Sequence, residues 1–334
     1  MAPYTIGKRD RSQLLLALPV LAAFVVAALA LSACGRGSQG SYPSKNVTLM
    51  VWAAPGSSSD IYGRTLGRVT EKYLGKPIVV ENKTGGAGLV AMKEIKGGAA
   101  DGYTILGNTA SLVTVLNGKD AGDVKLDDFD YLARIQLDPN ILAVPASSPY
   151  KTFEAFIAEA KKNPEKLKVA GFESGGYHQV TLTKAMSRGG FKVTWVPYKG
   201  AGDAVTAAMG EHVDAVFSNP QAMKGAFESK KLIPLATTAG SRLATFPDVP
   251  TFKEKGVDMD DYQWRGLMAK KGTPKEAIDT FLAAVQKGMK ETEWQNYMKS
   301  SNLMDGFLAG DDYKKQVQKE FDDAGKAMTQ LGLK

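Results

Sequence analysis

Three consecutive serines lie in a glycine-containing loop near the start of the chain, in the stretch Ala54–Asp60 (APGSSSD). Glycine lets backbone N–H groups point outward, and the N-terminus of a following helix favours negative charge. Three hydroxyls exceed what capping a helix requires. We therefore predict that Ser57, Ser58 and Ser59 contact an anionic ligand, with an ordinary N-cap run as the alternative. Asp60 is expected to cap or brace the helix.

A second loop, Lys83–Ala91 (KTGGAGLVA), follows an expected strand and has the glycines of an anion cradle. Its Gly-x-Gly-x-x-Ala spacing also resembles the dinucleotide-binding fingerprint. That fingerprint requires an acidic residue about 20 positions later, at the end of a second strand. Asp101 instead lies in a turn before a strand, which disfavours nucleotide binding. We predict an anion cradle, with a plain tight turn as the alternative. The predicted contacts are Gly86, Ala87 and Gly88.

The third candidate loop, Gly171–His178 (GFESGGYH), lies between an expected strand and an expected helix. Its hydroxyls and glycine amides are hydrogen-bond donors suited to an anion. We predict contacts from Ser174, Gly175 and Tyr177. His178 is interpreted as a first-turn helix residue with structural hydrogen bonds. A serine hydrolase is disfavoured, because the chain has no G-x-S-x-G elbow and only one other histidine.

The fourth candidate is the sequence Phe-Ser-Asn-Pro at residues 217–220, where Asn219 followed by proline is a good helix start. Ser218, at the end of an expected strand, is predicted to face the ligand. Asn108 and Thr109 are candidates of the same kind. Several large side chains could wall the site, and for each of them core packing is an equally good interpretation: Trp52, Trp195, Tyr198, Trp264 and Arg265.

Short β-rich runs alternate with helical patterns along the chain, which is typical of α/β layers with mostly parallel sheets. In such sheets, ligands bind beyond the carboxyl ends of the strands, where the four loops are expected. The expected strands are Val47–Ala53, Ile78–Glu81, Tyr103–Leu106, Ile141–Val144, Lys168–Ala170, Val193–Val196, Val213–Phe217, Leu232–Thr237 and Trp264–Ala269.

Two breaks in this pattern predict two lobes. Prolines and serines at Pro145–Pro149 interrupt the chain just after a strand, and a return is expected near Asp258–Trp264. We predict a first lobe of residues 45–144 and 265–334 and a second lobe of residues 145–264. Two crossings between two α/β lobes would create a cleft, a common place for a ligand.

The N-terminus has the features of an export signal. Lys8, Arg9 and Arg11 precede an apolar stretch at Leu14–Leu31, and the only cysteine of the chain, Cys34, follows small residues. This pattern predicts a lipoprotein signal peptide at residues 1–33, lipid attachment at Cys34 and a flexible Gly/Ser tether at residues 34–44. The alternative is an uncleaved membrane anchor. Either interpretation puts the rest of the chain outside the cytoplasm.

Composition excludes several classes of function. The 334 residues include 42 basic and 35 acidic side chains, giving a formal charge of +7, but no dense basic stripe with interleaved aromatics, so we expect no nucleic-acid binding. One cysteine and two histidines exclude a disulfide framework and a Cys/His zinc site. We expect no cofactor, no metal and a monomeric protein.

Several short motifs, in shared order and spacing, resemble the substrate-binding receptors of tripartite tricarboxylate transporters, the Bug or TctC-like family. They include the loop at 54–60 with Arg64 after it, the loop at 85–90 and Ala100–Thr104. Others are Val196–Gly200, Phe246–Thr251 and Gly272–Pro274. The resemblance covers residues 42 to about 289.

The resemblance implies an α/β, two-lobed type II periplasmic-binding-protein fold with two interdomain crossings and no catalysis. It implies a small carboxylate as ligand, held by amides, hydroxyls and water, and integral membrane transporter subunits as partners. Ser218 stands where many members have an aspartate suited to amino groups, which favours a plain or hydroxylated carboxylate over an amino acid. The alternatives are a ligand-sensing lipoprotein feeding a signalling receptor, and an exported hydrolase.

Overall fold

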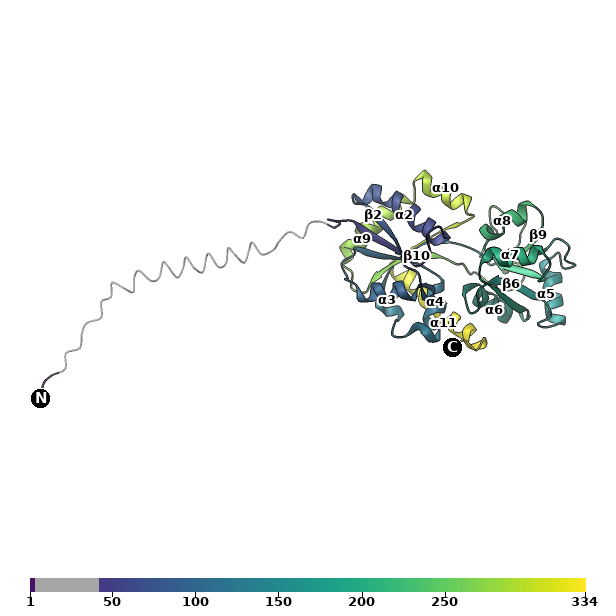
Figure 1. The fold of residues 1–334 in the computed structure, drawn as a ribbon, viewed down its shortest axis with the longest axis horizontal. Helices are drawn as coiled ribbons and strands as arrows, with labels where there is room; N and C mark the ends of the chain where they lie inside the picture. Colours follow the sequence, from purple (N-terminus) through teal and green to yellow (C-terminus); the bar gives the residue numbers. More distant parts are fainter. Residues whose placement is uncertain (4–41) are drawn as a thin grey trace. The chain divides into compact units, whose positions relative to one another are not determined.

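The computed structural model of the protein describes residues 1–3 and 42–334, and the compact part is Lys45–Lys334 (Figure 1). Residues 4–33 of the predicted signal segment, the predicted lipid-bearing Cys34 and most of the predicted tether lie outside the described residues. Within the described part, no helix combines the length and the apolar character needed to cross a membrane. The unit Lys45–Lys334 contains two β-sheets, and each sheet is the centre of one lobe.

The sheet of the first lobe has six strands in the order β11-β4-β10-β3-β1-β2. β1 pairs in parallel with β2 and β3, whereas β10 lies antiparallel between β3 and β4, and β11 is antiparallel to β4. The strands are β1 (Val47–Val51), β2 (Ile78–Asn82), β3 (Thr104–Thr109), β4 (Phe129–Leu137), β10 (Arg265–Lys270) and β11 (Met304–Ala309).

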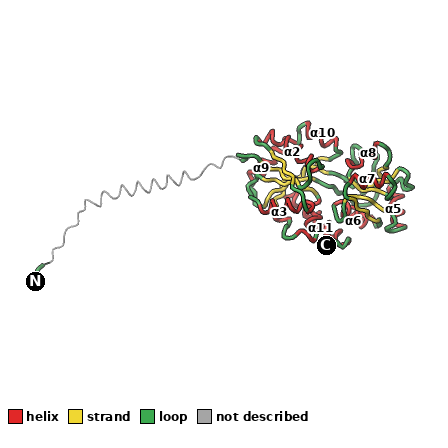
Figure 2. Tube along the Cα trace, in the orientation of Figure 1, coloured by secondary structure: helices red, strands yellow, loops and turns green. Residues whose placement is uncertain are grey.

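Helices cover this sheet on both sides, with α2 and α10 on one side and α3 and α11 on the other (Figure 2). The core contains Trp264, Tyr131 and Tyr313, whose rings pack edge to face, which removes large apolar areas from water. The helices are α2 (Ser58–Leu74), α3 (Leu89–Gly97), α4 (Ser111–Asn117), α9 (Lys275–Gly288), α10 (Thr292–Ser300) and α11 (Gly310–Gln330).

The sheet of the second lobe has five strands in the order β7-β6-β8-β5-β9. β6 pairs in parallel with β7 and β8, and β5 is antiparallel to β8 and β9. Its strands are β5 (Ile141–Pro145), β6 (Lys168–Phe172), β7 (Thr194–Tyr198), β8 (Ala215–Ser218) and β9 (Leu232–Thr237). Its helices are α5 (Phe153–Lys162), α6 (Tyr177–Gly189), α7 (Ala201–Met209) and α8 (Pro220–Glu228).

The sheets are mixed, so the prediction of mostly parallel sheets is wrong. β5 and β10 carry the chain into and back from the second lobe and run against their neighbours. β4 and β11 are strands that the sequence pattern did not reveal. β4 (FDYLARIQL) is buried on both faces apart from Asp130 and Arg134, so it lacks the strict alternation of a half-exposed strand.

The chain changes sheets between Leu137 and Ile141, earlier than the predicted boundary at 144/145, because β5 pairs entirely within the second sheet. We call residues 138–140 the first crossing and residues 260–264 the second crossing. The two crossings pair with each other through a bridge between Pro139 and Tyr262. The Gln263 amide also donates to the Asp138 carbonyl at 2.8 Å.

Candidate functional site

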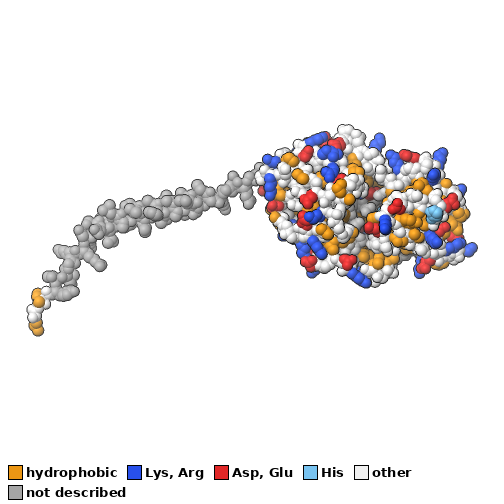
Figure 3. Space-filling view, viewed as in Figure 1, with side chains coloured by type: hydrophobic (Ala, Val, Ile, Leu, Met, Phe, Trp, Pro, Cys, Tyr) orange, Lys and Arg blue, Asp and Glu red, His pale blue; other side chains and the backbone are white. Residues whose placement is uncertain are grey.

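Strand directions bring the carboxyl edges of both sheets to the crossings. In the first lobe, Thr109 at the end of β3 pairs with Arg265 at the start of β10. In the second lobe, Ser218 at the end of β8 pairs with Ile141 at the start of β5. The loops after β1, β2, β3, β6 and β8 therefore surround the two crossings, and the surface is hollowed between the lobes (Figure 3).

The first loop is braced by its own residues. Asp60 accepts from the Gly56 amide at 2.9 Å, from Arg64 at 2.9 Å and from the Asn82 amide group at 2.9 Å. The hydrogen bond from Arg64, helped by the Gly56 and Asn82 donors, lowers the pKa of Asp60 to about 2 despite desolvation. Asp60 is thus a brace, as predicted, that fixes the loop after β1 against the end of β2.

The three serines of this loop have different surroundings. Ser57 is the N-cap of α2, and its hydroxyl accepts from the Asp60 amide at 3.3 Å. The exposed Ser58 lies in the first turn of α2, and its hydroxyl accepts from Nη2 of Arg265 at 2.9 Å. Ser59 is half-buried beside them. Ser58 keeps its own hydrogen available as a donor, because it acts as an acceptor toward Arg265.

The second loop is a strained turn that only glycine-rich sequence permits. Its four residues from Gly85 to Gly88 all have positive φ, at 123°, 55°, 50° and 107°. A side chain at Gly88 would place its Cβ 2.5 Å from the ring of Trp52, so the loop lies directly on that indole. Gly86 and Ala87 remain exposed at the N-terminal side of α3. Successive backbone amides in such conformations form anion-binding concavities.

Two predicted contacts at the end of β3 are engaged inside the fold. Asn108 is fully buried and exchanges hydrogen bonds with the hydroxyl of Tyr313, at 3.1 and 3.3 Å. Thr109 is buried as well, and its hydroxyl accepts from the amide of Ser111 at 3.2 Å. Both side chains stabilise the first lobe around the site.

Some of the predicted contacts of the second lobe are hydrogen-bonded inside the fold, and others are not. Ser174 is exposed, whereas the Gly175 amide donates to the side chain of Gln179 at 2.6 Å. Tyr177 is buried in the core of the first lobe and donates its hydroxyl to Asp261 of the second crossing. Ser218 is fully buried, and its hydroxyl has no hydrogen-bond partner. Ser174 and Ser218 are the contacts whose side chains the fold leaves uncommitted.

His178 lacks the structural hydrogen bonds that the sequence analysis expected. Its ring packs edge to face against Phe217 and Tyr177, and neither ring nitrogen has a partner. Burial lowers the pKa of His178 to about 4, so the imidazole is neutral at pH 7.

Sequence reasoning missed a polar cluster at the crossings. Arg265, considered only as a wall, is buried and lies 3.6 Å from the equally buried Asp138 of the first crossing. Asp138 also accepts from the N-cap residue of α8, Asn219, at 3.3 Å. Burial raises the pKa of Asp138 to about 6, although Arg265 and Asn219 oppose the rise. The polar run Gln136-Leu-Asp-Pro-Asn140 at a strand end was the available signal.

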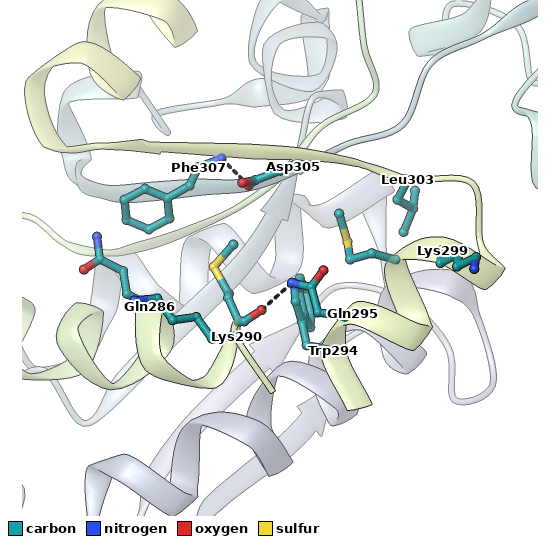
Figure 4. Close-up of a pocket in the computed structure, with 10 residues that line it drawn as sticks. Gln286, Lys290, Trp294, Gln295, Lys299, Leu303, Asp305 and Phe307 are labelled. Atoms are coloured by element: carbon teal, nitrogen blue, oxygen red, sulfur yellow. Dashed lines mark hydrogen bonds between the residues drawn. The ribbon is translucent and has the colours of Figure 1, made fainter. Parts of the chain in front are cut away.

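A separate groove of about 630 Å³ lies between α9, α10 and β11 (Figure 4). Trp294 and Gln295 of α10 line it, and the Gln295 side chain donates to the carbonyl of Met289 at 2.7 Å. None of the predicted site residues lines this groove. It is therefore distinct from the cluster at the crossings.

Two lobes with mixed sheets, joined by two crossings, are the architecture found in solved solute-binding proteins. The family profile described as "Tripartite tricarboxylate transporter family receptor" matches residues 63–333. The chain belongs to this family of substrate-binding receptors.

Relatives agree with this assignment. The chain is 32% identical to the "UPF0065 protein in gbd 5'region" of Cupriavidus necator, over 83% of this chain and 84% of that protein. It is 30% identical to protein BugT of Bordetella pertussis, over 72% of this chain and 75% of that protein.

Solved structures share the fold. A TctC solute-binding protein from Polaromonas has a TM-score of 0.79 and 26% identity, covering 87% of this chain and all of that chain. An R. palustris protein with adipate has a TM-score of 0.73 and 24% identity, over 87% of this chain and 99% of that one. MatC from Rhodopseudomonas palustris with bound malate has a TM-score of 0.69 and 23% identity, over 86% and 99%.

Proposed function

We propose that this protein is an extracytoplasmic, lipid-anchored receptor that captures a small carboxylate between its lobes and delivers it to a tripartite tricarboxylate-type membrane transporter. The observation that carries the proposal is the meeting of the two carboxyl edges at the crossings, with exposed hydroxyls and amides of the loops after β1, β2 and β6 around them.

The chemistry of these loops suits capture without reaction. Hydroxyls and main-chain amides replace the water shell of an anion, and the first turn of α2 adds a favourable dipole. Hydrogen bonds to a charged group contribute about 1.5–3 kcal/mol each. A few of them, less the cost of ordering, reach the roughly −8 kcal/mol of a micromolar complex. Closure of the lobes at the crossings then excludes water.

Thermal unfolding with a ligand panel tests capture. The panel contains adipate and malate, the ligands of two proteins with this fold, together with succinate and citrate. At a concentration 100 times the Kd, a ligand stabilises by about 2.7 kcal/mol, which corresponds to a rise in Tm of about 5 °C. The matched controls are the diamides of succinate and adipate, which lack the charge. A flat response across all carboxylates would contradict the proposal.

Replacement of the predicted lipid-bearing cysteine tests the anchor. In Cys34→Ala, we expect the mature protein to leave the membrane fraction and appear in soluble form, because the acylation site is absent. Fractionation of cells expressing each form, with detection by immunoblot, measures the amount of protein in the membrane and soluble fractions. Equal membrane attachment of the variant and the parent would point to an uncleaved helix instead.

A further inference from the structure

We infer that Arg265 is the charge-selecting residue of the site, placing a positive group against a ligand carboxylate at the first turn of α2. This inference rests on the proposed function and deepens it, because it assigns recognition of the ionised carboxylate to one side chain of this chain.

The position of Arg265 supports this role. It is the first residue of β10, where the second crossing ends, and it pairs with Thr109 of β3 and Gln136 of β4. Its Nη2 reaches Ser58 in the first turn of α2 at 2.9 Å. The guanidinium therefore lies at the carboxyl edge of the first sheet, among the loops that the proposed function uses.

The bonding of Arg265 is incomplete. Its side chain is 5% exposed, and its Nε has no hydrogen-bond partner. Its Nη1 lies 3.6 Å from Asp138, longer than the roughly 2.7–2.9 Å of a well-formed charge-assisted hydrogen bond. A buried guanidinium has five N–H donors, and leaving them unpaired is costly. A carboxylate beside Ser58 would supply the missing acceptor.

The surroundings of Asp138 explain how Arg265 can contact both Asp138 and a ligand carboxylate. One oxygen of Asp138 has no partner, and the other accepts from Asn219 of the second lobe. The polar chain Ser58–Arg265–Asp138–Asn219 thus runs from the first lobe through the first crossing to the second lobe. An anion at Ser58 engages this chain at its first-lobe end, while Asp138 keeps the buried cation balanced.

Calorimetry on the full mature chain tests the inference with adipate, malate and succinate as probes. The variant is Arg265→Gln, and the matched control is Arg68→Gln on α2, where the arginine is half-exposed and pairs with Glu293. We expect Arg265→Gln to weaken binding of the best probe at least tenfold. We also expect its preference for the carboxylate over the corresponding diamide to fall by a similar factor, whereas Arg68→Gln leaves both unchanged.

A second variant guards against misfolding. Arg265→Gln leaves Asp138 buried without a cation, so the double variant Arg265→Gln/Asp138→Asn restores a neutral pair of similar shape. It is expected to fold and to show the same loss of charge preference. If either folded variant keeps the parent's preference, the inference is overturned while the proposed function stands. If the parent binds no carboxylate at all, both are overturned.

Discussion

Each crossing carries one aspartate with little exposure, Asp138 buried and Asp261 with 12% of its side chain exposed, and the two are bonded very differently. Asp261 of the second crossing accepts hydrogen bonds from three side chains of α6, namely Tyr177, Thr181 and Lys184. Asp138 of the first crossing has Arg265 at 3.6 Å, Asn219 at 3.3 Å and one oxygen without a partner. The carboxylate of Asp261 is therefore fully hydrogen-bonded, whereas that of Asp138 is only partly so.

The pKa shifts of the two carboxyl groups follow this difference. Burial alone would raise the pKa of Asp261, but Lys184, Tyr177 and Thr181 outweigh it and hold the pKa below its ordinary value. At Asp138, burial prevails and raises the pKa to about 6. Buried polar groups that a fold leaves unsatisfied are candidates for function, whereas satisfied ones stabilise structure. We therefore propose that Asp261 stabilises the fold and that ligand recognition takes place in the neighbourhood of Asp138.

The largest effect is expected from Asp261→Ala. Removing this carboxylate leaves Lys184, Tyr177 and Thr181 without their acceptor between α6 and the second crossing, which should lower the free energy of unfolding by about 3 kcal/mol or more. Urea denaturation measures the loss. Asp258→Ala, at an exposed position nearby, is the control and should stay within about 0.5 kcal/mol of the parent. A loss no greater than the control's would remove the structural role of Asp261.

Asp138→Asn is expected to change how stability depends on pH. Because the folded-state pKa of Asp138 is raised to about 6 from 3.8, the folded protein binds its proton more tightly than the unfolded chain. The contribution of Asp138 to stability therefore falls as pH rises from about 4 to about 6. Asp138→Asn lacks this loss, so it should gain about 3 kcal/mol relative to the parent between pH 4 and pH 7.

Asp261→Asn is the matched control for that experiment. In the parent protein the pKa of the Asp261 carboxyl group is lowered, so the stabilising contribution of Asp261 is present above pH 4 and is lost only at lower pH. Urea titrations of the parent and both variants from pH 4 to pH 7 give the slopes. A flat difference for Asp138→Asn, or a steep one for Asp261→Asn in this window, would reverse the assignment.

The smallest effect is expected from Ser58→Ala. This change removes one hydroxyl donor and the Ser58 partner of Arg265, while the N-cap of α2 at Ser57 is retained. We expect carboxylate affinity to fall about fivefold with little change in stability, as for one hydrogen bond of about 1 kcal/mol. Ser187→Ala, at an exposed position near the end of α6, is the control. Calorimetry with the best probe measures both, and equal affinities would exclude Ser58 from the site.

Elements with strong local signals could be predicted from sequence. Nine strands were placed near their observed positions, because β-rich runs ended by glycine, proline or polar residues determine them locally. β11 (MDGFLA) was missed because Gly306 and Asp305 interrupt its pattern, and it forms only by pairing with β4. Antiparallel β5 and β10 follow from the crossings, which are long-range features.

The candidate site was predictable where chemistry and backbone are local. Glycine-rich and serine-rich loops reveal themselves in sequence, and Asp60 was interpreted correctly as a brace. Tyr177 and Asn108 have the same chemistry, yet tertiary partners, Asp261 and Tyr313, engage them. The pairing of Arg265 with Asp138 joins residues 127 positions apart, and no local pattern indicates such a contact.

We propose that a carboxylate binds where the two lobes meet, against the first turn of α2. A crystal structure of the mature chain, soaked or co-crystallised with the probe that stabilises it most, tests this directly. We expect carboxylate oxygens within hydrogen-bond distance of Ser58 and Arg265, with the second lobe on the ligand's other side. A ligand bound in the groove between α9, α10 and β11, with the crossings unchanged, would contradict it.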